Sequence, residues 1–288
     1  MRLGKLQRRM RAGGSPLQAL LTLLVMVAFL ALYREVLVGL VQQSIADENY
    51  NHGLLIPPIA GILLYRSLDR LPRIAEPSLR AGLAFLLPGF ALLVGGTAAA
   101  ELFTLRLSML FVFWGLVRGL YGLRSFRVLR FPLFFLVFMI PPPDVFFYRV
   151  ALPLDLLSAR ASVQVLDFLG VVHVLTGSII HLRQASLDVV TACSGLRSLL
   201  ALIAFAVLAA SLFDMRRGLR GLLVALAVPI AIATNALRIV VTAVLVHLSG
   251  PAFLEGTLHQ AMGLLSFGLG VALLILIGRG FRWQRPSA

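Results

Sequence analysis

Residues 195–213 read GLRSLLALIAFAVLAASLF, and Arg197 carries the only charged side chain in this run. An α-helix needs roughly 17 to 25 apolar residues to cross the hydrocarbon core of a bilayer. The run therefore predicts a transmembrane helix. Comparable apolar runs recur along the chain, at about 17–40, 54–65, 81–100, 102–122, 131–140, 221–248 and 260–278. Together they predict an all-α polytopic membrane protein with about eight transmembrane helices.

The composition supports the same class. Of the 288 residues, 59% are hydrophobic and only 13% are charged, whereas a soluble domain carries about 25% charged residues. Such a chain cannot cover a water-exposed surface, so a soluble globule is excluded. The single cysteine, Cys193, excludes an intrachain disulfide and any metal site built from several cysteines.

Prolines mark the irregular spans. The runs 54–65 and 131–140 are short, and Pro57-Pro58 and Pro132 stand near their starts, where a first helical turn tolerates proline. The run 221–248 is long and contains Pro229, which predicts a kink or a break.

Basic residues gather in alternate connections between the predicted spans. An excess of Lys and Arg marks the cytoplasmic side of a membrane protein, so both termini, residues 1–16 and 279–288, are predicted to be cytoplasmic. The same pattern explains the net charge of +14 without a nucleic-acid partner. This set of connections holds 19 of the 26 basic residues and three of the 12 acidic ones, the basic members being Arg2, Lys5, Arg8, Arg9, Arg11, Arg66, Arg70, Arg73, Arg80, Arg118, Arg124, Arg127, Arg130, Arg216, Arg217, Arg220, Arg279, Arg282 and Arg285.

The main non-cytoplasmic segment is 141–192, between the fifth and sixth predicted spans of a transmembrane domain covering 17–278. In residues 152–170, LPLDLLSARASVQVLDFLG, apolar and charged side chains mix as in a short amphipathic helix at the interface. Residues 172–190, VHVLTGSIIHLRQASLDVV, are β-branched and contain a Thr-Gly-Ser turn, which predicts a small hairpin. The polar loop 41–53 and the Gly/Pro loop 249–258 lie on the same side.

Three side chains that carry chemistry lie at one level of the membrane. Counted at ~1.5 Å of rise per residue, Cys193, Arg238 and His259 lie about 33, 25 and 30 Å from the cytoplasmic edge of their helices. The hydrocarbon core is about 30 Å thick. All three side chains therefore reach the outer interface, and spacing alone leaves their lateral convergence open.

A cysteine, a histidine and an arginine at one level can form a nucleophilic site. The thiolate attacks a carbonyl, the imidazole moves protons, and the guanidinium stabilises negative charge. Cys193 precedes a helix start, and Arg197 lies one turn further on, both of which favour the thiolate. The alternative is structural: a packing cysteine, an arginine that extends to the headgroups, and an interfacial histidine. No HExxH or similar spacing occurs, so neither a metal nor another cofactor is expected.

Several blocks of the sequence resemble the exosortase/archaeosortase family. TACSGLRSLLAL (191–202), PIAIATNALRI (229–239) and the segment around His259 resemble its three signature blocks in order and spacing. NYNHGLLIPPI (49–59) and FMIPPPD (138–144) are also similar to family features. The resemblance covers roughly residues 50–265.

The resemblance implies a multi-pass cysteine protease, a transpeptidase, in the bacterial cytoplasmic (inner) membrane with its active site facing the periplasm. Its substrates would be exported proteins with a C-terminal sorting tail, made of a Pro-Glu-Pro-type motif, a transmembrane helix and a basic cluster. Cys193, Arg238 and His259 would be catalytic. Ser194, Arg197 and Asn235 would support them. Thr191 stands where family members often have an acidic residue, which leaves the protonation partner unassigned.

Two other functions account for the same spans. A non-catalytic membrane component of a polysaccharide or protein export system would use Arg238 to line a substrate path and would not need a reactive thiol. An integral-membrane acyltransferase would use a nucleophile or a histidine on lipid or sugar donors. Detection of peptide cleavage separates both from the protease.

Overall fold

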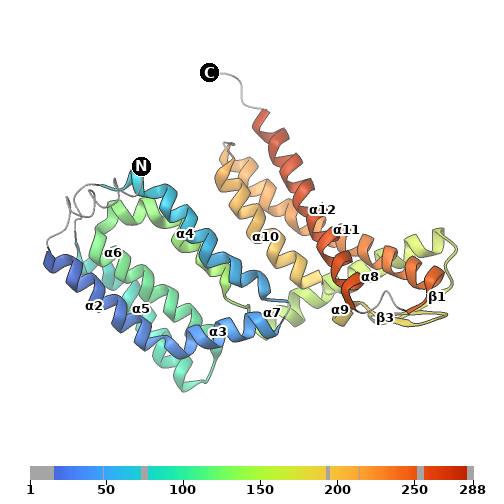
Figure 1. Cartoon of the computed structure of the whole chain (residues 1–288), viewed down its shortest axis with the longest axis horizontal. Helices are drawn as coiled ribbons and strands as arrows, with labels where there is room; N and C mark the ends of the chain where they lie inside the picture. Colours follow the sequence, from blue (N-terminus) through green and yellow to red (C-terminus); the bar gives the residue numbers. More distant parts are fainter. Residues whose placement is uncertain are drawn as a thin grey trace. The chain divides into compact units, whose positions relative to one another are not determined.

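The computed structural model describes residues 16–47, 49–72, 77–192, 195–213, 215–251 and 256–283. The chain forms two compact units, residues 1–142 and 143–288, and each is described by itself. The predicted transmembrane domain, 17–278, thus comprises parts of both units. Both are mainly helical, as the sequence predicts (Figure 1).

The first predicted span of unit 1 is bent, which corrects the expectation of one continuous helix over 17–40. Helices α2 (Pro16–Leu32) and α3 (Arg34–Ala46) meet at Tyr33 at an angle of 60°. The ring of Tyr33 is fully buried, and its hydroxyl lies 3.2 Å from Oγ of Ser108. The bend has a physical reason, because Arg34 and Glu35 are unfavourable inside a bilayer and here begin a separate helix.

Three elements follow in unit 1 before its helical hairpin. The 3-10 helix η1 (Asn51–Leu55) leads into α4 (Ile56–Ser67), which starts with the proline pair as expected, and η2 (Leu68–Arg70) ends it. Helix α5 (Leu79–Ala98) then packs along α6 (Leu102–Phe135). Gly82, Gly89 and Gly96 of α5 are buried. A Cβ at any of the three would come within 3.0 Å of α6, so these glycines allow the close approach of the two helices.

Helix α6 reverses direction at Gly122, whose φ of 78° and ψ of 177° are not helical. The indole Nε1 of Trp114 donates a hydrogen bond of 3.0 Å to the carbonyl of Leu133, 19 residues further on. A straight helix would separate these residues by about 28 Å. The two arms of α6 therefore pack against each other. The first corresponds to the predicted span 102–122, whereas the second starts after Gly122, earlier than the predicted span 131–140, so that Pro132 lies inside the helix and not near its start. The second arm continues into η3 (Leu136–Met139).

Unit 2 begins with the segment that the sequence predicts to be non-cytoplasmic. After α7 (Asp144–Phe146) and the π-helix η4 (Phe147–Ala151), the predicted amphipathic helix is present as α8 (Leu152–Phe168). The predicted hairpin is present as β1 (His173–Thr176) and β2 (Ile179–Leu182). A third antiparallel strand, β3 (Ser186–Asp188), was not expected, and it precedes α9 (Val189–Ala192).

Three long helices complete unit 2: α10 (Gly195–Leu212), α11 (Arg217–Ser249) and α12 (Gly256–Trp283). They pack side by side (Figure 1). Of the kink or break expected at Pro229, the break is absent, because α11 is one helix from Arg217 to Ser249. Toward its N-terminal end it packs with α10 and α12 through small residues such as Ala206, Ala227 and Ala231. Toward its C-terminal end it packs on α8 and the sheet through Ile239, Val240, Ala243 and Val246.

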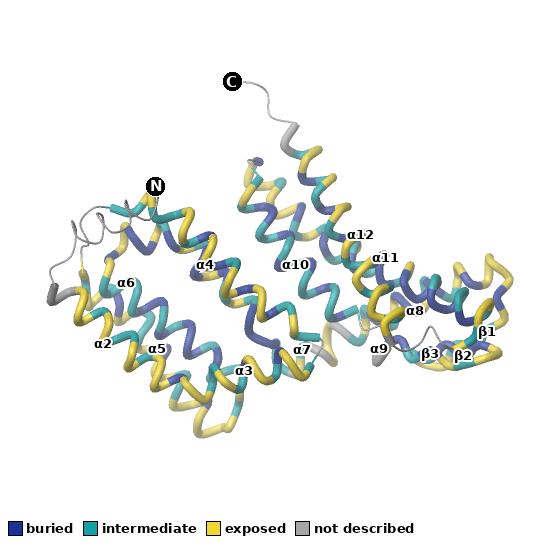
Figure 2. The backbone as a smooth tube through the Cα atoms, viewed as in Figure 1, coloured by how far each residue is buried: buried dark blue, intermediate teal, exposed yellow. Residues whose placement is uncertain are grey.

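Five helices among the described residues are long and apolar enough to cross a membrane, and a sixth crossing is obtained if α2 and α3 count as one bent span. Leu264, Leu265 and Leu276 of α12 are more than 60% exposed, as expected for side chains in contact with lipid. Figure 2 shows exposed positions along α12. The chain is therefore a multi-pass membrane protein. The number of eight spans and the cytoplasmic position of the termini stay predictions.

Candidate active site

An arginine and a histidine from two helices of unit 2 meet in a hydrogen bond. Nη2 of Arg238, on α11, lies 2.7 Å from Nε2 of His259, in the first turn of α12. The guanidinium also rests on the backbone of α12, since a Cβ at Gly263 would lie 3.4 Å from its Cζ. The lateral convergence that the spacing left open is therefore observed for these two residues.

The chemistry of the guanidinium determines which atom donates in this hydrogen bond. A guanidinium is always protonated and only donates hydrogen bonds, so Nε2 of His259 accepts. An imidazole that accepts through Nε2 is neutral and carries its proton on Nδ1. The pair thus combines a guanidinium that donates with an imidazole nitrogen that accepts.

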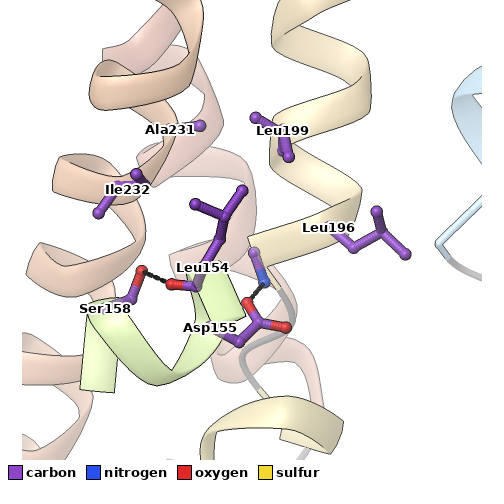
Figure 3. A pocket seen from close by; sticks show the side chains of 8 residues that line it. Leu154, Asp155, Ser158, Leu196, Leu199, Ala231 and Ile232 are labelled. Atoms are coloured by element: carbon purple, nitrogen blue, oxygen red, sulfur yellow. Dashed lines mark hydrogen bonds between the residues drawn. The ribbon is translucent and has the colours of Figure 1, made fainter. Parts of the chain in front are cut away.

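A carboxylate reaches the start of α10 from another helix. Oδ1 of Asp155, on α8, accepts a hydrogen bond of 2.7 Å from the backbone N–H of Gly195 (Figure 3). This N–H is the first of α10, and the first N–H groups of a helix have no partner within it. Asp155 is 1% exposed. It therefore caps α10 at a position two residues after Cys193.

Gly195 provides the space for this contact. A Cβ at Gly195 would lie 2.6 Å from Oδ1 of Asp155 and 3.1 Å from Nδ2 of Asn235. The first distance is shorter than Cβ atoms reach in proteins, and the second is unusually short. Asn235 is 3% exposed and lies on α11 three residues before Arg238. Residues three apart lie on one face of a helix. Asn235 thus lies beside Gly195 and on the same face of α11 as Arg238.

Burial dominates the electrostatics of Asp155. Desolvation raises the pKa of its carboxyl to about 6, and the hydrogen bond from Gly195 opposes the rise only in part. Within the described residues, Oδ2 of Asp155 and Nδ2 of Asn235 are buried and make no hydrogen bond. Asp155 also borders a cavity of about 10 Å³ with Leu199 and Ile232 (Figure 3), close to the minimum that one water needs.

The other predicted site residues differ in what the structure says of them. Cys193 and Ser194 lie outside the described residues. Arg197 is half-buried in the first turn of α10. The catalytic assignment of Cys193, Arg238 and His259 stays a prediction, and the position of the arginine and histidine is what the structure adds.

Asp155 is the residue that sequence reasoning missed. It was counted only as one of the charged positions of an amphipathic helix. A polar pattern in the sequence nevertheless points to it. In residues 152–162, LPLDLLSARAS, the side chains of Asp155, Ser158 and Ser162 are at helical spacing. All three are buried in the structure. Ser162 donates a hydrogen bond of 3.1 Å to the carbonyl of Ala236, which holds α8 against α11 beside the site.

Over the described ranges, no three His, Cys, Asp or Glu side chains are grouped so that they could hold a metal ion.

The fold and the site define a polytopic membrane protein in which a carboxylate caps the start of α10 and an arginine–histidine pair joins the two helices packed against α10. The sequence profile described as transmembrane exosortase (Exosortase_EpsH) matches residues 41–276, most of the chain. The protein therefore belongs to the exosortase family. No curated protein and no solved structure gave a match in the same comparisons.

Proposed function

We propose that this protein is a membrane-embedded cysteine protease and transpeptidase that cleaves C-terminal sorting tails of exported proteins. It acts at the outer face of the bacterial cytoplasmic membrane, with Cys193 as nucleophile and Arg238 and His259 as its partners. The single observation that carries the proposal is the 2.7 Å contact between Arg238 and His259, on helices packed with α10, the helix that follows Cys193.

In the proposed mechanism, the imidazole of His259 accepts a proton from the thiol and later donates it to the leaving amine. When a substrate carbonyl arrives, the guanidinium of Arg238 turns from Nε2 of His259 to the developing oxyanion, which it stabilises as a charged donor. The freed Nε2 then takes the proton of the Cys193 thiol. The thiolate attacks the carbonyl carbon and forms a tetrahedral intermediate.

The intermediate then collapses. The C–N bond breaks, His259 returns the proton to the leaving amine, and the new N-terminus departs with the transmembrane tail. The remaining thioester is resolved by water in hydrolysis or by an amine in transfer. The capping carboxylate of Asp155 holds the first N–H of α10 and so fixes the helix start next to the nucleophile.

The substrate class follows from the family and from the location of the site. A Pro-Glu-Pro-type motif followed by a transmembrane helix and a basic cluster would place its helix in the bilayer and its motif at the outer interface. The basic cluster would remain cytoplasmic. The motif would then lie at the level of Arg238 and His259, about 25 to 30 Å from the cytoplasmic edge of their helices.

The test uses the single cysteine, which leaves no labelling background. Spheroplasts are treated with a membrane-impermeant maleimide, and a tailed substrate is co-expressed with the wild type or Cys193→Ala. We expect labelling of the wild type from outside, no cleavage by Cys193→Ala, and a substrate–enzyme thioester that hydroxylamine releases from the wild type. Cleavage by Cys193→Ala at the wild-type rate would overturn the proposal.

A second outcome concerns the topology. Labelling that occurs only in inverted vesicles would place the thiol on the cytoplasmic side and contradict the site described above. Labelling from outside together with no cleavage of any tailed substrate would favour the non-catalytic export component.

A further inference from the structure

A second buried arginine lies in unit 1, away from the proposed reaction. Arg106 is in the second turn of α6 and is 4% exposed. Over the described ranges its guanidinium makes no hydrogen bond and no ion pair. An arginine cannot become neutral by losing its proton, and a buried charge without a partner is unfavourable. An external anionic partner would remove this conflict.

Glu101, whose charge acts on Arg106, is not the anionic partner of its guanidinium. Glu101 caps α6, and its two carboxylate oxygens accept the backbone N–H groups of Phe103 at 2.9 Å and Thr104 at 2.6 Å. Glu101 attracts Arg106 electrostatically but does not bond to it.

Arg106 lines a cavity of about 420 Å³ between α3 and the start of α6. Glu35, Gly39, Gln42 and Ala46 of α3 line the opposite wall. They are spaced four, three and four residues apart, which is one face of a helix. A Cβ at Gly39 would meet nothing within 4 Å, so this glycine leaves the middle of the wall open.

The other face of α3 is apolar and exposed. Val38, Val41 and Ile45 are 47%, 47% and 69% exposed. A helix with one polar and one apolar face lies at a membrane interface with its apolar face among acyl chains. The positive-inside pattern puts the connection between α5 and α6 on the non-cytoplasmic side, and Arg106 lies about 6 Å along α6 from its first residue. The cavity is thus at headgroup level.

We propose that this cavity binds one phospholipid, with the phosphate on Arg106 and the acyl chains along the apolar face of α3. A guanidinium matches phosphate with two parallel N–H donors. Glu35 on the opposite wall favours a headgroup that carries an ammonium group beside its phosphate over a purely anionic one. The inference is independent of the proposed function, because no residue of the Cys193 site belongs to this unit.

The experiment is native mass spectrometry of the full-length protein, purified in detergent and titrated with phosphatidylethanolamine, phosphatidylglycerol or inorganic phosphate. We expect one phosphatidylethanolamine to bind the wild type, with at least tenfold weaker binding to Arg106→Gln. Arg34→Gln is the matched control, since Arg34 is an exposed arginine of α3 that does not line the cavity. It should bind as the wild type does.

Gly39→Leu keeps the proposal testable if loss of Arg106 impairs folding. Leucine is a better helix former than glycine, and its side chain would project into the open cavity, so the protein should fold and lose the lipid. If either Arg106→Gln or Gly39→Leu binds the lipid as well as the wild type does, the proposed lipid site is overturned. Binding of inorganic phosphate alone would overturn the lipid as its source. Glu35→Gln should reduce the preference for phosphatidylethanolamine, and an unchanged preference would overturn the role of Glu35.

Discussion

The two units each bury an arginine, and the two arginines have opposite surroundings. Arg238 in unit 2 is 8% exposed and bonds to His259 from the neighbouring helix. Arg106 in unit 1 is 4% exposed and, within the described residues, lines a cavity without a hydrogen bond. Both charges are equally unfavourable to bury in a membrane protein.

The difference concerns where the partner comes from. Unit 2 supplies an internal partner, His259, and in the proposed mechanism the guanidinium of Arg238 moves from this imidazole to the oxyanion. Unit 1 supplies a shaped space, so its guanidinium is completed by a molecule from outside. A buried cation with a replaceable internal partner suits catalysis, whereas one with an empty cavity suits binding.

The largest expected effect is at Arg238. Replacing it by lysine keeps the charge but removes the planar fork that contacts His259 and the oxyanion. We expect Arg238→Lys to lower the rate of tail cleavage by about 10²- to 10³-fold, the usual loss for an oxyanion donor. The measurement is a cleavage time course in proteoliposomes that contain enzyme and tailed substrate.

Arg160→Lys is the control for this variant, because Arg160 is exposed on α8 of the same unit. It should cleave within a factor of about two of the wild type. A similar rate for Arg238→Lys would mean that the arginine of unit 2 is structural and that the contrast with Arg106 does not exist.

The second effect is the pH dependence of stability due to Asp155. Its pKa is about 6 in the folded protein against a usual value of 3.8. Between these values the folded state binds more protons than the unfolded state, so the free energy of unfolding falls as pH rises from about 4 to 6 and stays low above. The full decrease is about 3 kcal/mol.

Asp155→Asn keeps an oxygen that accepts from Gly195 and removes the titration. We expect this variant to be more stable than the wild type at pH 8, by about 1 to 3 kcal/mol, and to show a flatter dependence between pH 4.5 and 7. Thermal unfolding in detergent over this range measures it. Asp167→Asn, at an exposed carboxylate of α8, should keep the wild-type slope. The same slope in Asp155→Asn would assign the pH dependence to another group.

Much of this architecture is predictable from the sequence. Hydrophobic runs and prolines locate the helices of both units, and the β-branched run around Gly177 predicts the hairpin. The height of Arg238 and His259 follows from counting residues along their helices. These features depend on local composition and on the fixed rise of an α-helix, which a single sequence reports directly.

The remaining features depend on partners distant in the chain. Asp155 contacts Gly195 across 40 residues, and Arg106 shares a cavity with residues of α3 that lie 60 or more positions earlier in the chain. Neither fact is encoded in the neighbouring residues. Pro229 shows the reverse case. The local rule predicts a kink or a break there, whereas α11, packed against α8, α10 and α12, continues past the proline as one helix.

The third effect tests how unit 1 is built. Gly122→Ala places a side chain at a φ of 78° and a ψ of 177°, a region that costs other residues about 1 to 3 kcal/mol. We expect a loss of about 2 kcal/mol in unfolding free energy, followed through the fluorescence of Trp114, which the reversal buries. Gly119→Ala is the control, since its Cβ would make an ordinary 3.6 Å contact with Gly82. Equal stability of the two variants would contradict the reversal at Gly122.

The smallest effect connects the bend of α2 and α3 with the cavity of Arg106. Tyr33→Phe removes one hydroxyl contact with Ser108, while Ser108 keeps its 2.7 Å bond to the carbonyl of Leu105. No buried donor is left unsatisfied, so we expect a loss of only about 0.5 to 1 kcal/mol. Lipid binding in native mass spectra should weaken, because α3 forms one wall of the cavity. Tail cleavage should keep its wild-type rate. Weakened cleavage with intact lipid binding would show that the bend serves unit 2, and that the two arginines are not independent.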